Sequence, residues 1–487
     1  MKLHDLVIDL SDSPAVLELS EDATVRTRFS HKQLQYFMTE ISQGIGEICS
    51  PGDYVGVYSD STSTAIALML GVLKADCVFC YISSNLTTAQ SKSLIQRCPI
   101  RCIVTTEELD ADARTELSLT AVDWNQKNSF DVDLFWYHRP VASAREDGKS
   151  EPMAYVMQTS GSTGASKLVR VPHSCIVPNI MDFNNMFDVK PRDCFVLLAP
   201  LTFDPCIIDI FVSLSCGASL LVLSRDQKLD PGVWFQLLDR RLVTVVQGTP
   251  SLFRLLGSEV MSRILGPQSP IRILAFCGET CPTPAELRVW KHSDNRTRIF
   301  NLYGITEVSC FGTVHEITDE FLRKTNLESI PLGQKMSKTV IDLRKDSDSN
   351  ESVLYMGGPE RRTLLDDESW SSAPELRSTG DIVREVEGQL FFVGRADFEI
   401  KRLGKRINLD AIRKSVLELS TVTDCWIIQD SSQSPLLYCI VRITENADWP
   451  AVKADIKNKI GQDFPSYYCP NYFIRTNHIP LTPHGRS

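Results

Sequence analysis

The chain has 487 residues, of which 43% are hydrophobic and 23% are charged, as is typical of ordinary globular proteins of two or more domains. Its net charge of −10 and its pI near 5.4 argue against partners such as nucleic acid or an anionic membrane surface. No stretch has the length of a membrane span, and the longest apolar run, residues 64–73, predicts a buried helix.

The N-terminus and the cysteines indicate a cytoplasmic protein. Acidic residues interrupt the short apolar stretch of residues 1–9, so a signal-peptide core is not expected. The fifteen cysteines are an odd number and lie mostly in apolar segments, which favours reduced thiols over a disulfide framework. Cys77 and Cys80 form the one C-x-x-C pair, but in a strand-like run their side chains would point to opposite faces. Neither a redox pair nor a metal site is therefore predicted there.

Short β-branched runs alternate with helix-length amphipathic segments in the first half of the chain, which predicts an α/β fold with largely buried sheets. Residues 139–152 are polar and predict a surface linker, and residues 345–352 predict an exposed turn. Beyond residue 379 the pattern changes to a small α+β unit. The predicted strands are 54–58, 77–82, 194–198, 219–223, 243–247, 271–276, 389–393, 424–428 and 436–443, and the later predicted helices are 409–419 and 451–460.

The run from Tyr155 to Lys167 predicts a phosphate-binding loop. A strand-like lead opens into four hydroxyl residues and two glycines, and a lysine closes the run. Glycines let backbone N–H groups approach an anion closely, and hydroxyls add further donors. The run is not a Walker loop, because Ser166 and Leu168 flank the lysine where that motif requires glycine and a hydroxyl residue. By itself the run could equally be a solvent-exposed loop.

Three further motifs carry a resemblance to a known family. Residues 300–307 are Phe-Asn-Leu-Tyr-Gly-Ile-Thr-Glu, residues 378–381 are Ser-Thr-Gly-Asp, and residues 393–407 begin Val-Gly-Arg-Ala-Asp. Together with the glycine-rich loop, their order and spacing resemble the adenylate-forming superfamily, over essentially the whole chain. The resemblance implies a large N-terminal domain of layered sheets with helices, residues 1–396, which holds the ATP and substrate sites. It also implies a small mobile α+β lid domain, residues 397–487, with its hinge at Asp397.

Within this superfamily the chain resembles the amino-acid-activating branch. Residues 200–205, Pro-Leu-Thr-Phe-Asp-Pro, and 217–220 resemble the segment that holds a substrate ammonium, and residues 171–180 are similar to the β-alanine-activating enzymes. The resemblance implies activation of an amino acid, most of all β-alanine, as aminoacyl-AMP with release of pyrophosphate. The acyl group would then pass to phosphopantetheine, coenzyme A or an amine. The sequence shows no carrier or propeller region, so a carrier protein is expected to act in trans.

The resemblance also implies roles at ATP. Lys167 would grip the β- and γ-phosphates, while Thr306 and Glu307 would hold the α-phosphate and Mg²⁺, which takes hard oxygen ligands. Tyr303 would stack on adenine, and Asp381 would accept from the ribose hydroxyls. Outside these motifs, Glu307 would be an ordinary helix-entry carboxylate and Thr-Gly-Asp an ordinary turn. The full set expected at ATP is Thr159, Ser160, Gly161, Ser162, Thr163, Gly164, Lys167, Gly278, Glu279, Tyr303, Gly304, Thr306, Asp381 and Arg395.

Asp204 is the predicted substrate-discriminating residue. A carboxylate in an apolar stretch is costly unless it is paired, and an amino-acid ammonium would pair it where a fatty acid would not. The alternative is a buried aspartate satisfied by an arginine or by backbone donors. The resemblance adds the pocket residues Pro205, Ile208, Gln247, Cys277, Cys310 and Phe311.

The C-terminal end departs from the family pattern. The resemblance assigns Lys401 to the second half-reaction, but Arg486 stands where the superfamily has its catalytic lysine. Arginine keeps the charge but is larger, planar and fork-shaped. Asn408 likewise replaces the usual glutamate. Two alternatives therefore remain open: a fatty or aryl acid–CoA ligase, against which Asp204 argues, and a catalytically weakened nucleotide-binding homologue that acts through partners. The predicted catalytic set is Lys167, Thr306, Glu307, Lys401 and Arg486.

Overall fold

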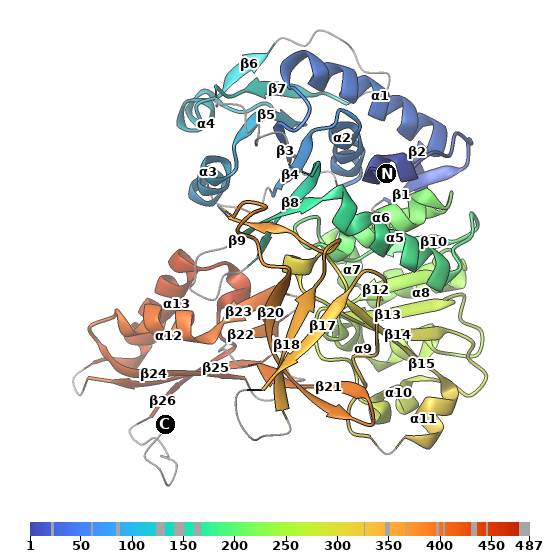
Figure 1. Cartoon of the computed structure of the whole chain (residues 1–487). Coiled ribbons are helices and arrows are strands. Elements are labelled where there is room, and N and C mark those ends of the chain that lie inside the picture. Colours follow the sequence, from blue (N-terminus) through green and yellow to red (C-terminus); the bar gives the residue numbers. More distant parts are fainter. Residues whose placement is uncertain are drawn as a thin grey trace.

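Two large sheets with helices packed between them make up most of the molecule (Figure 1). The structure is a computed structural model, and it describes the chain except for residues 21–23, 60–61, 84–87, 123–131, 141–150, 160–166, 326, 346–350, 367, 396–398, 403–404, 430–435, 445–446 and 477–487. The layered α/β architecture confirms the fold class expected from the sequence.

The first large sheet has eight strands in the order β19-β9-β8-β4-β3-β5-β7-β6. Strands β3, β4, β5 and β8 run parallel in its centre, and antiparallel pairs flank them. Central strands that are covered on both faces are apolar throughout, as β3 is. The strands are β3 (Tyr54–Tyr58), β4 (Val78–Ile82), β5 (Ile100–Thr105), β6 (Thr120–Val122), β7 (Phe135–His138), β8 (Met153–Thr159), β9 (Lys167–Pro172) and β19 (Leu364–Leu365).

The second large sheet has nine strands in the order β16-β15-β14-β13-β12-β10-β11-β1-β2. Its six central strands, from β14 to β1, are parallel, so their carboxyl ends meet at one edge. Ligands of open α/β sheets bind at such an edge. The strands are β1 (Pro14–Leu19), β2 (Val25–Ser30), β10 (Cys194–Leu197), β11 (Ser219–Val222), β12 (Val245–Gly248), β13 (Ile273–Cys277), β14 (Arg298–Tyr303), β15 (Thr313–Ile317) and β16 (Gln334–Lys335).

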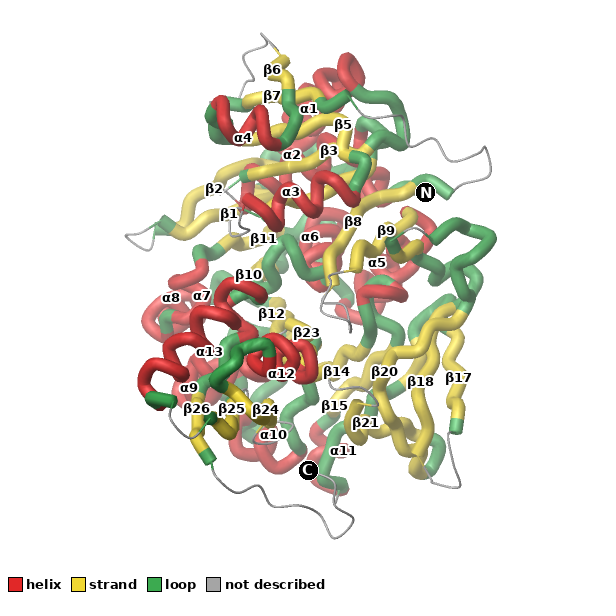
Figure 2. Tube along the Cα trace, turned by 90° about the vertical axis from the view of Figure 1, so that its left-hand side faces the viewer, coloured by secondary structure: helices red, strands yellow, loops and turns green. Residues whose placement is uncertain are grey.

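Helices α1, α2, α5 and α6 contribute to one core shared with both large sheets. Helix α2 is buried at every residue from Ser63 to Leu73, as expected for a helix that is apolar all round, and this confirms the helix predicted at 64–73. Figures 1 and 2 both show α1, α2 and α3 beside β3 and β5. The helices here are α1 (His31–Ile48), α2 (Thr62–Lys74), α3 (Thr88–Arg97), α4 (Ala111–Glu116), α5 (His173–Phe187), α6 (Pro205–Ser215), α7 (Arg225–Leu229), α8 (Pro231–Asp239), α9 (Pro250–Ile264), α10 (Pro284–Trp290) and α11 (Asp319–Lys324), with short 3₁₀ helices η1 (Leu3–Leu6) and η2 (Thr306–Val308).

The C-terminal part contains three smaller sheets. A four-stranded sheet, β17-β18-β20-β21, precedes a unit with its own apolar core of helices α12 and α13 against strands β24 and β25. Figure 1 shows this unit at the lower left. The domain boundary after residue 396 stays a prediction. The elements are β17 (Val340–Arg344), β18 (Glu351–Gly357), β20 (Leu376–Val386), β21 (Gln389–Arg395), β22 (Glu399–Arg402), β23 (Lys405–Asn408), α12 (Leu409–Leu417), β24 (Val422–Gln429), β25 (Leu437–Ile443), α13 (Trp449–Asp463), η3 (Ser466–Tyr468) and β26 (Tyr472–Arg475).

Most predicted strands and helices are confirmed to within about two residues at their ends. Strand β26 was not predicted; it joins β25 in parallel at one edge of its sheet. All fifteen cysteines are free thiols, and only Cys216 and Cys469 are not buried. Within the described residues, none of the helices combines the length and the apolar character that a bilayer crossing demands.

A buried histidine makes the N-terminal region sensitive to acid. The backbone N–H of Leu3 donates to Nδ1 of His173, which is 4% exposed, at 2.9 Å. Burial, together with the charges of the nearby His4 and Lys2, lowers the pKa of His173 to about 4. The folded pKa lies below the unfolded value, so the unfolded chain binds more protons in mild acid. This contribution to stability is complete above about pH 6.5 and is lost as the pH falls toward 4.

We therefore expect the stability advantage of the wild type over His173→Gln to fall by about 2 kcal/mol between pH 7 and pH 5. The reason is that the unfolded chain binds a proton at His173 in this range, whereas folded His173, with its pKa of about 4, stays neutral and keeps the hydrogen bond from Leu3. Urea denaturation of both proteins at the two pH values measures the difference. An advantage that does not change with pH would contradict the assignment of a neutral, buried His173.

Candidate active site

The predicted phosphate-binding loop connects β8 to β9. These strands pair antiparallel, with Thr159 opposite Lys167 where the loop begins and ends, and both residues are half-buried. The residues between them, including Ser160, Gly161, Ser162, Thr163 and Gly164, lie outside the described part of the chain. The hairpin therefore brings the first and last residues of the loop together, as a phosphate cradle needs.

Glu307 lies in η2, directly after β14. Gly304 must be glycine, because a Cβ there would lie 2.2 Å from the carbonyl oxygen of Cys310 and 2.7 Å from Cα of Phe311. This close approach folds the chain back, so that Thr306 and Glu307 follow the carboxyl end of a central strand. Glu307 is 8% exposed, and Thr363 donates to its backbone carbonyl at 2.6 Å.

The Glu307 carboxylate suits Mg²⁺ by its chemistry. Magnesium is held by one or two carboxylates together with substrate phosphates, rather than by a cage of protein ligands. Among the described residues, no group of three or more His, Cys, Asp or Glu side chains is placed to hold a metal ion. Glu307 would therefore supply one hard oxygen ligand, and phosphate oxygens would supply others.

Tyr303, Asp381 and Arg395 form one buried cluster. The Tyr303 hydroxyl donates to Oδ2 of Asp381, and Nη1 of Arg395 donates to Oδ1 at 2.8 Å. Asp381 and Arg395 are register partners in β20 and β21, which explains how the two motifs meet. Each carboxylate oxygen keeps a further lone pair for a ribose hydroxyl. The contacts with adenine and ribose remain predictions.

Gly278 and Glu279 follow β13. Gly278 has a φ of +78°, a conformation that favours glycine, and a Cβ there would contact Phe203 and Thr249 at 3.4 Å. Oε2 of Glu279 accepts from the backbone N–H of Ser251 at 2.9 Å. Both predicted ATP residues thus lie beside Tyr303, because β13 and β14 are parallel neighbours.

Asp204 is a buried carboxylate at the N-terminus of α6. It is 2% exposed, and Pro205 follows it as the first helical residue. Burial and then the charge of Asp204 raise the pKa values of Cys310 and of Tyr155, so all three groups face one another. The Tyr155 hydroxyl is also 2.8 Å from Oγ of Ser309. The surroundings are apolar and include the Cys310 thiol, so the buried charge of Asp204 would attract a cationic ligand more strongly than it would in water.

The other predicted pocket residues lie around Asp204 or directly behind it. Gln247 is buried at the end of β12; its Nε2 donates to the carbonyl of Pro205 at 3.2 Å, and its Oε1 has no partner among the described residues. The charge of Cys277 contributes to the raised pKa of Cys310. Ile208 and Phe311 are buried in the main core. The structure thus places Gln247, Cys277 and Cys310 near Asp204 and Pro205, while Ile208 and Phe311 belong to the main core; their contacts with a substrate stay predictions.

The C-terminal residues are only partly described. Lys401 lies in β22, and its side chain is outside the described part, as are Asp397 and Arg486 entirely. Asn408 has a structural role that the sequence did not reveal. Its Oδ1 accepts from the backbone N–H of Ala411 at 2.8 Å and caps α12. A glutamate is a poorer cap, so the exchange at this position has a physical reason.

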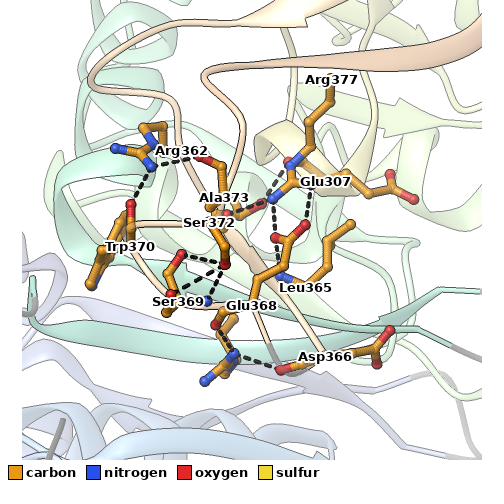
Figure 3. A network of polar contacts seen from close by, with 12 residues as sticks. Glu307, Arg362, Leu365, Asp366, Glu368, Ser369, Trp370, Ser372, Ala373 and Arg377 are labelled. Atoms are coloured by element: carbon orange, nitrogen blue, oxygen red, sulfur yellow. Dashed lines mark hydrogen bonds and ion pairs between the residues drawn. The ribbon is translucent and has the colours of Figure 1, made fainter.

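Sequence reasoning missed the segment that links these parts. Thr363 and Asp366 lie between β18 and β20: Thr363 contacts Glu307, and Asp366 contacts β9. Arg377, in β20, donates to the carbonyl of Thr363 and pairs with Glu368 (Figure 3). Asp366 has a φ of +40°, but no motif marks the segment in the sequence.

The chain matches proteins and structures of one family. The model of the AMP-binding enzyme family matches residues 11–359. The beta-alanine-activating enzyme of Mus musculus is 31% identical over 94% of this chain and 45% of its own length. That of Homo sapiens is 37% identical over 69% of this chain and 31% of its own length. The chain thus spans less than half of these relatives. The Vibrio cholerae adenylation domain AlmE, solved with glycyl-adenosine-5'-phosphate, aligns with a TM-score of 0.75 at 19% identity, over 98% of this chain and 94% of AlmE.

Proposed function

Because the chain belongs to the AMP-binding enzyme family, we propose that it activates an amino acid with ATP, and that its preferred substrate is β-alanine. The observation that carries this proposal is Asp204, a carboxylate buried beside Cys310 and Tyr155. A substrate ammonium would compensate its charge at low dielectric. The relatives named above, which are β-alanine-activating enzymes, support the choice of substrate.

In the proposed reaction, a carboxylate oxygen of the amino acid attacks the α-phosphorus of ATP. The bond to the bridging oxygen breaks, and pyrophosphate leaves with the electron pair. Asp204 would fix the ammonium end, so that the carboxylate is held in line with the leaving group. Lys167 would offset the charge that builds on the β- and γ-phosphates. Magnesium held at Glu307 would neutralise phosphate charge.

The activated acyl group would then move to an acceptor. We propose the thiol of phosphopantetheine on a carrier protein, with coenzyme A or an amine as alternatives. The thiol sulfur would attack the acyl carbon and release AMP. Lys401 and the hinge at Asp397 would serve this second step, as the matching motif of residues 393–407 implies. The fifteen free thiols favour a reducing compartment such as the cytoplasm.

A pyrophosphate-exchange panel tests the proposal. With amino and carboxylic acids as substrates, we expect incorporation of labelled pyrophosphate into ATP with β-alanine and little with propionate, which lacks the amine. Exchange that is fastest with a fatty or aryl acid would favour an acid–CoA ligase. No exchange with any acid would sink the first proposal.

A second candidate is a weakened nucleotide-binding homologue, which Arg486 favours. Its planar guanidinium is a poor substitute for a lysine in a tight site. On this view the protein binds Mg-ATP without turnover, and Arg486→Lys restores exchange. An exchange rate that is high in the wild type and unchanged in Arg486→Lys would exclude it.

A further inference from the structure

One segment connects the two predicted phosphate-binding parts of the site. We call residues 361–366 and 368–377 the bridging segment; it follows β18 and ends in the first two residues of β20. Figure 3 shows several of its side chains. Its contacts fall into two groups, one at Leu168 in β9 and one at the turn from Glu307 to Phe311. The segment therefore sets how these parts lie relative to each other.

At β9, Asp366 holds both backbone groups of Leu168. The N–H of Leu168 donates to Oδ1 of Asp366 at 3.0 Å, and the N–H of Asp366 donates to the carbonyl of Leu168 at 2.9 Å. Strand β19 pairs with the following residues of β9, so the bonds at Leu168 extend this pairing toward Lys167. Lys167 directly precedes Leu168 in β9, and its own backbone pairs with Thr159.

Asp366 has a second side-chain partner. Nη2 of Arg97, at the end of α3, donates to the same Oδ1 at 2.6 Å. This pair is partly exposed, so on its own it contributes little to stability. Mutation can separate the hydrogen bond to Leu168 from the ion pair with Arg97. The hydrogen bond needs only an acceptor oxygen, whereas the ion pair also needs a negative charge.

At the turn, the bridging segment binds two carbonyl groups. Oγ1 of Thr363 donates to the carbonyl of Glu307, and Nη2 of Arg361 donates to the carbonyl of Phe311, each at 2.6 Å. Thr363 and Arg361 are both fully buried. The turn that carries Glu307 and the pocket residue Phe311 is thus fixed at both ends.

An ion pair stiffens the segment between these two groups of contacts. Arg377 donates to both carboxylate oxygens of Glu368 at 2.5 and 3.1 Å, and to the carbonyl of Thr363 at 2.8 Å. Glu368 also accepts from the N–H of Leu365 at 2.9 Å. Burial would raise the pKa of Glu368, but these hydrogen bonds and the charge of Arg377 outweigh it and lower the pKa. Glu368 is therefore ionised and paired at neutral pH.

We infer that Asp366 is a positioning residue for Lys167, and that the bridging segment holds Lys167 at a fixed separation from Glu307. The inference rests on the proposed function, in which both residues act on one triphosphate. Groups that stabilise a transferring phosphoryl group must be held to within a fraction of an ångström. Asp366 provides this precision on the Lys167 side, and Thr363 provides it on the Glu307 side.

The test uses two substitutions that both tolerate the positive φ of Asp366. Asp366→Gly removes the acceptor for Leu168, whereas Asp366→Asn keeps an oxygen at Oδ1 and removes only the charge. Arg97→Gln is the matched control, because it removes the ion pair and leaves the Leu168 bond intact. The measurements are the Kd of Mg-ATP by calorimetry, KM values in pyrophosphate exchange, and hydrogen exchange of residues 167–172.

Asp366→Gly is expected to raise the Kd and the KM for ATP about tenfold, to leave the KM for β-alanine unchanged, and to speed amide exchange at Leu168. Asp366→Asn and Arg97→Gln should stay within about threefold of the wild type. Thr363→Val should instead weaken the Mg²⁺-dependent part of ATP binding without changing exchange at residues 167–172. This pattern of results would distinguish a loss of Lys167 positioning from a general loss of stability.

Three outcomes with the variants would overturn the inference. Equal effects of Asp366→Gly and Asp366→Asn would show that charge, not the bond to Leu168, matters. A parallel rise in both KM values would indicate general loss of structure. Faster amide exchange with unchanged ATP affinity would show that the position of Lys167 is unimportant. Because calorimetry needs no turnover, a wild type that binds ATP but activates no acid would refute the proposed function and still test Asp366. A wild type that does not bind Mg-ATP would overturn both.

Discussion

Asp204→Asn is expected to lower kcat/KM for β-alanine in pyrophosphate exchange about 100-fold or more, because removing one partner of a buried charge pair leaves the other uncompensated. Asparagine has nearly the same shape, so the pocket formed with Cys310 and Tyr155 keeps its packing. Affinity for Mg-ATP should not change, since the cluster of Tyr303 and Asp381 is formed by other elements. Exchange kinetics and calorimetric titration with ATP measure the two quantities.

Asp209 offers a matched control on the same helix. It is buried further along α6, and burial raises the pKa of its carboxyl well above the ordinary value, although Lys228 opposes this. Burial disfavours the charge on this carboxyl, so little should be lost when it becomes an amide. Asp209→Asn should therefore retain β-alanine exchange to within a few-fold of the wild type. Equal losses in the two variants would mean that α6 tolerates no change, and not that Asp204 binds the ammonium.

A comparison of two substrates tests whether Asp204 binds the ammonium group. Wild type should discriminate strongly between β-alanine and propionate, because propionate has no ammonium to interact with the buried carboxylate of Asp204. Asp204→Asn should lower the ratio of kcat/KM for β-alanine to kcat/KM for propionate, because a neutral amide gains little from the substrate's ammonium. A ratio that the substitution leaves unchanged would favour the alternative in which Asp204 is a structural carboxylate.

The site was predictable from sequence wherever function depends on residues in one local motif. Gly304 and Glu307 belong to one run after a strand, and Asp381 and Arg395 belong to two motifs on paired strands. Local periodicity also placed β3 and α2, whose apolar residues must be buried whatever the rest of the chain does. Such features need no knowledge of distant contacts.

The bridging segment could not be predicted in the same way. Asp366 and Leu168 are 198 positions apart, and their bond depends on the packing of β19 against β9. Nothing in the residues around Asp366 distinguishes it from an exposed acidic turn. Strand β26 escaped prediction for a similar reason, since it is short and gains its hydrogen bonds from β25. Asn408 was noticed as a departure, but its cap on α12 became clear only from the structure.

Glu307→Gln is expected to lower kcat for pyrophosphate exchange about 100-fold or more, the size of effect seen when one group that stabilises developing charge is removed. Glutamine keeps the shape of the side chain and the backbone carbonyl that Thr363 binds, so the turn should stay in place. The substitution removes a negative charge that can hold Mg²⁺ against the phosphates. The apparent affinity for Mg²⁺ should therefore fall together with kcat.

The readout that isolates Glu307 is ATP binding with and without Mg²⁺. In the wild type, Mg²⁺ should strengthen ATP binding, and Glu307→Gln should remove most of that increase while leaving magnesium-free binding unchanged. Glu316→Gln is the control, because Glu316 pairs on the surface with Arg298 and lies outside the site. If Glu307→Gln weakens ATP binding as strongly without Mg²⁺ as with it, the carboxylate serves the fold of the turn and not the metal. Thr363 binds the backbone carbonyl of Glu307, so this hydrogen bond does not require the Glu307 carboxylate and should persist in Glu307→Gln.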